Sequence, residues 1–114
     1  MALTMNFEET PQYLRLLMVG DLDYGECAGF RMSIDRILSA AHAATVVDLS
    51  GLEYLDSSGL GLLLSLSKEY SAEGGKLVLV TSDTVNNILS LTRLNGIFAT
   101  APTLEEATQV LGHA

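Results

Sequence analysis

Two adjacent serines stand in a short polar segment, Asp56-Ser57-Ser58-Gly59, between a β-branched run and a leucine-rich stretch. The β-branched run predicts a buried strand and the leucine-rich stretch predicts a helix, so the serines fall where that helix begins. The first N–H groups of a helix lack partners within it, and Asp56 or Ser57 can accept one of these hydrogen bonds, which stabilises the helix by about 1 kcal/mol. One interpretation of the serines is therefore structural.

A second interpretation gives one serine hydroxyl a chemical role. At the exposed start of a helix, a phosphate ester would meet unpaired N–H groups and the positive end of the helix dipole. It would add about −1.5 to −2 units of charge next to Asp56. The domain would stay folded, while a partner that fits a neutral hydroxyl would be repelled. The residues alone leave both interpretations open.

Other catalytic and metal-binding patterns are missing from the sequence. The isolated His42 and His113 are expected at the surface, and Cys27 has no second cysteine nearby, so neither a metal site nor a cofactor is predicted. The serines do not follow the Gly-x-Ser-x-Gly pattern of hydrolases, and Gly59 and Gly61 lack the third glycine and the lysine of nucleotide-binding loops. We therefore expect that the protein is not an enzyme.

The composition limits which class of protein this is and which partners it can bind. The 114 residues are 48% hydrophobic, which suits one domain, residues 1–114, with its own core. The net charge of −8 and the scattered cations argue against binding to nucleic acid or to anionic lipid. No secretory-signal pattern occurs, and no apolar stretch approaches the roughly 20 residues that cross a bilayer. We expect a soluble cytoplasmic protein with neither nucleic acid nor membrane as a partner.

Apolar periodicity predicts the elements that position the serines. The predicted elements are, in order, strands at 3–8 and 13–19, a helix at 27–41, a strand at 45–49, a helix at 57–73, a strand at 76–80, a short helix capped by Asp83, a short strand at 96–100 and a helix with a Thr103–Glu106 capping box. Gly20 and Gly51 are expected to end the strands before them. Strands alternating with helices predict an α/β fold with a parallel centre and the N-terminal hairpin at one edge.

Five segments resemble, in order and at matching spacings, the STAS domains of bacterial anti-sigma factor antagonists. They are GDLD (20–23), VVDLSGLEYLDSSGLGLLL (46–64), GGKLVLV (74–80), LTRLNGIF (91–98) and TLEEA (103–107). The resemblance covers nearly the whole chain, and the DSSGLG element is its specific part. It implies a mixed sheet of four to five strands with about four helices. It also implies that Ser57 is the phosphorylation site and that Ser58 is a helix-capping neighbour.

The resemblance implies a partner-switching function. The unphosphorylated chain would bind an anti-sigma factor that is also a serine kinase, and would thereby release the sigma factor. Phosphorylation of Ser57 would end this binding, and a metal-dependent Ser/Thr phosphatase would restore it. A non-switching STAS module of a transport or signalling-scaffold complex is the alternative, and a small-ligand binder is a weaker third reading.

Six residues around the serine are expected to face the partner: Asp23, Asp56, Ser58, Gly59, Leu62 and Leu66. Asp23 matches a family aspartate in the loop opposite the phosphorylation site, although it could instead cap the helix near Cys27. Leu62 and Leu66 lie on a different helix face from Leu60 and Leu63, so they remain accessible if only the latter face packs on the sheet. Burial against a neighbouring helix is the alternative for this pair.

Two positions depart from the family pattern. Glu26 stands where the family has Thr or Ser, and it adds negative charge near the expected partner surface. Arg93 stands where the family has Gly at the end of a helix. We expect Asn95-Gly96 to make the turn in its place.

Overall fold

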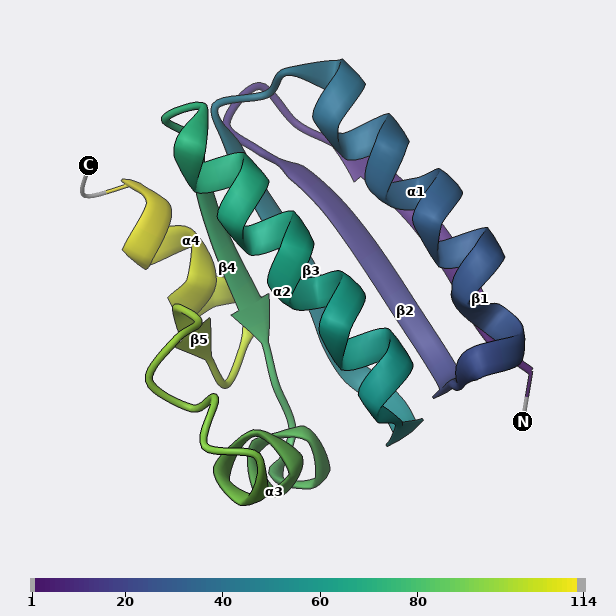
Figure 1. Cartoon of the computed structure of the whole chain (residues 1–114). Helices are drawn as coiled ribbons and strands as arrows, with labels where there is room; N and C mark the ends of the chain where they lie inside the picture. The colour runs from purple at the N-terminus through teal and green to yellow at the C-terminus, as the bar shows by residue number, and fades with distance from the viewer. Residues whose placement is uncertain (1, 113–114) are drawn as a thin grey trace.

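The fold is an α/β arrangement of five strands and four α-helices, described for residues 2–112 by a computed structural model (Figure 1). His113 lies outside the described residues. The elements are β1 (Thr4–Glu9), β2 (Leu14–Leu22), a 3₁₀ turn η1 (Tyr24–Glu26), α1 (Cys27–Ala40), β3 (Ala44–Leu55), α2 (Ser57–Ala72), β4 (Lys76–Val80), α3 (Asp83–Leu91), β5 (Thr100–Ala101) and α4 (Leu104–Gly112).

The strands lie in the order β1-β2-β3-β4-β5. β1 pairs antiparallel with β2, and the other neighbours pair parallel. The predicted hairpin therefore sits at one edge of a mixed sheet with a parallel centre, as expected. Because all the parallel strands point the same way, the loops that follow β2, β3 and β4 gather at one end of the molecule.

The helices form layers on both faces of the sheet. α1 and α2 lie side by side over one face, and α4 covers part of the other, over β3, β4 and β5 (Figure 1). Alternate strand residues enter the two cores. Leu16 and Val47 belong to the core under α1 and α2, whereas Val46 and Val78 belong to the smaller core under α4.

Two strands run past the glycines that were expected to end them. β2 continues through Gly20 to Leu22, and β3 continues through Gly51 to Leu55, with irregular pairing along the shared ladder. Gly20 has φ +110°, and a Cβ at that position would lie 2.3 Å from the carbonyl oxygen of Ala2. A glycine inside a strand often marks such an irregularity or a close backbone approach. The two strands consequently end together, and the Asp56 N–H donates to the Leu22 carbonyl (3.2 Å).

The C-terminal third differs from the sequence-based expectation in two boundaries. Ser82, rather than Asp83, caps α3, because its hydroxyl accepts the Val85 N–H (3.3 Å). The last strand is only β5, Thr100–Ala101, and lies later than the predicted 96–100. The Thr103 cap is confirmed, since its hydroxyl accepts the Glu106 N–H (3.1 Å).

Helix α3 ends at a left-handed residue, Arg93, two residues before the Asn95-Gly96 turn. Arg93 has φ +60°, the left-handed conformation in which a helix commonly ends. The next N–H, that of Leu94, donates to the Leu89 carbonyl (2.8 Å) and closes the end of α3. Arg93 itself adopts the conformation that glycine adopts more easily. The expected turn at Asn95-Gly96 is also present, closed by the Ile97 N–H, which donates to the Leu94 carbonyl (3.0 Å), but it follows the reversal at Arg93 and does not replace it.

Candidate functional site

Asp56 organises the start of α2. Its backbone is extended, and one carboxylate oxygen, Oδ1, accepts the N–H groups of Ser58 (3.0 Å) and Gly59 (3.2 Å). The other oxygen, Oδ2, accepts the Tyr24 N–H (3.0 Å) from η1. The carboxylate thus caps α2 and ties the helix to the loop that follows β2, a connection between residues 32 positions apart.

Ser57 is the first residue of α2 and is exposed to solvent. Because Asp56 supplies the cap, the Ser57 hydroxyl is not required for capping, and of the two acceptors suggested by the sequence Asp56 is the one used. Ser58 is half-buried and donates its N–H to Asp56, so it is capped by the aspartate and does not cap the helix itself. An exposed hydroxyl therefore stands at a helix start that is already stabilised.

Asp23 caps η1. Its Oδ1 accepts the Glu26 N–H (3.1 Å), and its carbonyl accepts the Cys27 thiol (3.3 Å). The capping role considered for Asp23 is therefore present, one turn earlier than expected, at the start of η1. The structure brings both carboxylates to the N-terminal end of η1, where Asp23 accepts the Glu26 N–H and Asp56 accepts the Tyr24 N–H. Whether either contacts a partner remains a prediction.

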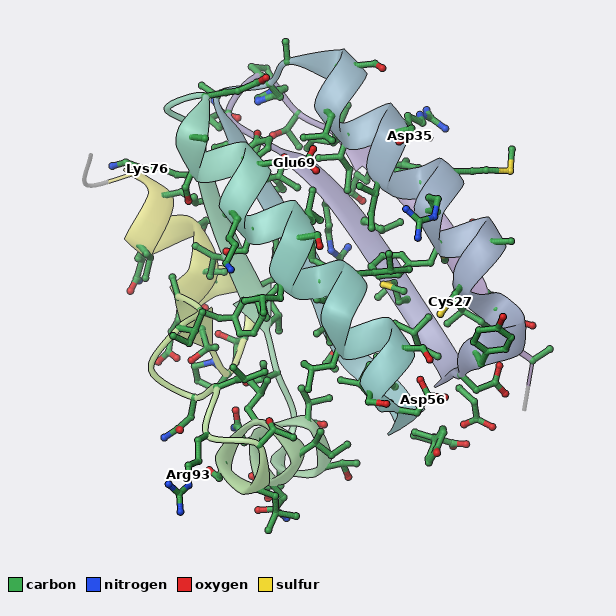
Figure 2. The ribbon with its side chains drawn as sticks, in the orientation of Figure 1. Cys27, Asp35, Asp56, Glu69, Lys76 and Arg93 are labelled. Carbon is green, nitrogen blue, oxygen red and sulfur yellow. The ribbon has the colours of Figure 1, made fainter. Side chains whose placement is uncertain are left out.

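The negative charge of this region acts on the Cys27 thiol. Burial raises the pKa of Cys27, the charges of Asp56 and Asp23 raise it further, and Arg31 partly opposes them. Figure 2 shows Cys27 and Asp56 at the same end of the molecule, where α1 and α2 begin. The thiol is therefore held in its protonated, weakly nucleophilic form at neutral pH, and the region presents a negative field to anything that approaches Ser57.

Two of the six predicted partner-facing positions are buried. Leu66 is 1% exposed and belongs to the main core, and Gly59 is packed against Leu22 and Leu55. α2 packs on the sheet and also against α1, so a wider helix face is covered than the sequence pattern suggested. The predictions that Leu66 and Gly59 contact a partner are wrong. Leu62 is only partly buried against the core.

We expect opposite effects of the same substitution at two glycines of α2. A Cβ on Gly59 would lie 2.6 Å from Leu22 Cγ and 3.1 Å from Leu55 Cδ1, so Gly59→Ala should lower the free energy of unfolding by about 2 kcal/mol. Gly61 has no such neighbour within 4 Å, and Gly61→Ala should raise the free energy of unfolding by about 1 kcal/mol through helix propensity. Urea denaturation followed by circular dichroism measures both, and shifts of the same sign would contradict the packing assigned to Gly59.

A buried polar network crosses the middle of the sheet, and sequence reasoning did not single it out. Asp48 is 3% exposed and accepts Arg15 Nη2 (2.7 Å), the Ser50 hydroxyl (2.6 Å) and the Ser50 N–H. Burial raises the pKa of Asp48, but the hydrogen bonds from Ser50 and Arg15 outweigh it, so this pKa lies below its usual value. An aspartate inside the apolar run of residues 46–49 was the available signal. The network stabilises the sheet away from Ser57.

Sequence reasoning also missed two exposed tyrosines beside the serine. Tyr24 lies in η1 and Tyr54 near the end of β3, and their exposed fractions are 79% and 51%. The available signals were that Tyr24 directly follows Asp23, and that Tyr54 precedes the buried Leu55 and so points to the opposite side of the strand.

Other kinds of site have less support. Within residues 2–112, no group of three or more His, Cys, Asp or Glu side chains is arranged to hold a metal ion, and no helix combines the length and the apolar character needed to cross a membrane. A hollow of about 240 Å³ lies at the other end of α2, lined by His42, Tyr70, Gly74 and Gly75 among others. His42 is half-buried there, with Nε2 3.3 Å from the Thr10 carbonyl oxygen. Ser57 does not line this hollow.

Comparisons with known proteins agree with this fold. The family model of the STAS domain matches residues 4–107. A STAS-domain containing protein of Pseudomonas aeruginosa (strain UCBPP-PA14) is 32% identical over 99 residues, 86% of this chain and 97% of that protein. An anti-sigma F factor antagonist of Paenibacillus polymyxa is 26% identical over 112 residues, 97% of this chain and 94% of that protein.

Solved structures include similar proteins, among them SpoIIAA. The anti-sigma factor antagonist SpoIIAA in its unphosphorylated form superposes with a TM-score of 0.78 at 25% identity, covering 97% of this chain and 98% of that one. SpoIIAA of Bacillus in its phosphorylated form gives a TM-score of 0.71 at 26% identity, covering 95% of this chain and 99% of that one.

Proposed function

The chain belongs to the STAS domain family, and on that basis we propose that it is an anti-sigma factor antagonist whose binding is switched by phosphorylation of Ser57. The unphosphorylated form binds an anti-sigma factor that is also a serine kinase, so the sigma factor is released. A metal-dependent Ser/Thr phosphatase reverses the modification in the cytoplasm, where ATP is available to the kinase. The similarity to an anti-sigma F factor antagonist and to SpoIIAA, of which a phosphorylated form is known, supports this assignment.

The observation that carries the proposal is the position of Ser57. It is exposed, it begins α2, and the cap of α2 comes from Asp56. A kinase can therefore reach the hydroxyl without unfolding the helix. In the reaction, the Ser57 oxygen bonds to the γ-phosphorus of ATP, the bond to the bridging oxygen breaks to leave ADP, and the hydroxyl proton passes to a base of the kinase.

The same position explains why phosphorylation ends binding. A phosphate adds about −1.5 to −2 units of charge beside Asp56 and Asp23, in a region that already raises the pKa of Cys27. A partner surface that closes over this point must remove water from the new charge, and that cost is large unless a cation compensates it. The fold itself need not change for the partner to leave.

Mapping the phosphate tests the proposal directly. The chain is incubated with Mg-ATP and each purified anti-sigma serine kinase from its own genome, and the product is analysed by mass spectrometry. We expect one phosphoryl group, located on Ser57. Ser57→Ala should accept none and should still bind the kinase, whereas the control Ser58→Ala should be modified as the wild type is.

Two outcomes would contradict the assignment. Phosphate found only on Ser58 or Ser90 would mean that a different hydroxyl is the substrate. A chain that accepts no phosphate, binds none of the kinases and co-purifies with the ATPase of a membrane transporter would be a non-switching STAS module.

A further inference from the structure

Two exposed tyrosines are attached close to the point where β3 passes into α2. Tyr24 is 79% exposed and its N–H donates to Asp56 Oδ2 (3.0 Å); Tyr54 is 51% exposed and lies two residues before Asp56. Tyr54 is also paired with Asp21 across the β2–β3 ladder. Both tyrosines are therefore attached to a backbone that the sheet and the Asp56 carboxylate hold in place, at the end of the sheet where α2 begins.

Exposed tyrosine rings are well suited to a protein–protein interface. A tyrosine has a large apolar face and few side-chain rotations to lose, so it contributes much binding energy when a partner covers it. Within residues 2–112, the other large apolar side chains left exposed are aliphatic: Met32, Leu91, Ile97 and Val110. The two aromatic ones adjoin the helix start that carries Ser57.

The charge around the rings restricts what can cover them. Segments 20–30 and 49–67 contain no lysine or arginine. Their acidic residues are Asp21, Asp23, Glu26, Glu53 and Asp56. A second copy of this chain would bring the same negative surface against itself, which is unfavourable, whereas a basic protein surface would be attracted.

We propose that Tyr24 and Tyr54 are the aromatic anchors of the surface that docks the anti-sigma factor. The complementary surface has apolar pockets for the two rings and lysine or arginine side chains that face the acidic residues of segments 20–30 and 49–67. This inference rests on the proposed function and adds to it the residues that hold the partner. Phosphate on Ser57 would then add negative charge at the same end of the molecule, where the partner docks.

The test compares single substitutions against the purified anti-sigma factor that binds the unmodified chain. Tyr24→Ala and Tyr54→Ala should each raise Kd at least about tenfold by isothermal titration calorimetry, and the corresponding Phe variants should stay within about threefold of the wild type. Val110→Ala, on α4 and 49% exposed, is the matched control and should bind as the wild type does. Raised ionic strength should weaken binding of the wild type. Urea unfolding midpoints should be unchanged by the two Ala substitutions.

The outcomes separate this inference from the proposed function. If both Ala variants bind as the wild type does while Ser57→Asp binds at least about tenfold more weakly, the tyrosine anchors are wrong and the switch stands. If Ser57→Ala and Ser57→Asp bind equally, the switch is wrong whatever the tyrosines do. A wild-type dimer in sedimentation that becomes monomeric in Tyr24→Ala would assign the surface to a second copy and overturn the inference.

Discussion

Phosphorylation of Ser57 is expected to raise the Kd for the anti-sigma factor about a hundredfold, and Ser57→Asp at least about tenfold, because a fixed charge replaces a neutral hydroxyl at the docking surface. Ser57 begins α2 beside Asp56, and the surrounding carboxylates already give this end of the molecule a negative field. The Asp side chain carries less charge than a phosphate and fewer oxygens, so its effect is smaller. Ser57→Ala should bind within about threefold of the unmodified chain.

Isothermal titration calorimetry with the phosphorylated chain, Ser57→Asp and Ser57→Ala measures these changes in Kd relative to the unmodified chain. Ser71→Asp is the matched control: it adds the same charge to the exposed face of the same helix, but in the last turn, away from Asp56. It should leave Kd close to that of the wild type. Equal binding by the unmodified and phosphorylated chains would contradict the switch, and a loss of binding in Ser71→Asp as large as in Ser57→Asp would mean that net charge, and not its position, governs the interaction.

Removing the buried carboxylate should have the largest effect on stability: Asp48→Ala should lower the free energy of unfolding by about 3 kcal/mol. The Arg15 guanidinium, whose side chain is 19% exposed, would lose its 2.7 Å partner while remaining largely covered. The Ser50 hydroxyl and N–H would lose an acceptor as well. Glu8 stands 3.8 Å from Arg15 but is 56% exposed, so it cannot replace a buried partner. Urea denaturation of the wild type and of Asp48→Ala measures this difference in the free energy of unfolding.

The contribution of Asp48 to the free energy of unfolding should also depend on pH. The pKa of Asp48 is lower in the folded protein than in the unfolded chain, so its stabilising effect is complete above the ordinary value of about 4 and is lost as the pH falls through the folded-state pKa. The stability difference between the wild type and Asp48→Ala should therefore be full at neutral pH and shrink in acid. Glu8→Ala, which removes only the exposed partner of Arg15, should lower the free energy of unfolding by less than about 0.5 kcal/mol. A pH-independent difference would contradict the ion pair.

Much of the architecture was predictable because it follows from short-range patterns. The order of elements, the hairpin at the sheet edge and the helix that begins at Ser57 all follow from apolar period and capping residues within a few positions. The position of the DSSGLG segment is likewise predictable, since a polar group directly before a leucine-rich helix must lie at the N-terminus of that helix. Local rules were sufficient for these features.

Contacts between distant segments decided the rest. Gly20 and Gly51 looked like strand ends, but the ladder between β2 and β3 carries both strands through them. Leu66 looked accessible until α1 was packed beside α2. The backbone of Tyr24 is held by a hydrogen bond to a carboxylate 32 residues away. The sequence by itself therefore determined which elements form and that the serine lies at a helix start. The tertiary structure determined which side chains around that serine face the core and which face solvent, because burial depends on neighbours that no local pattern specifies.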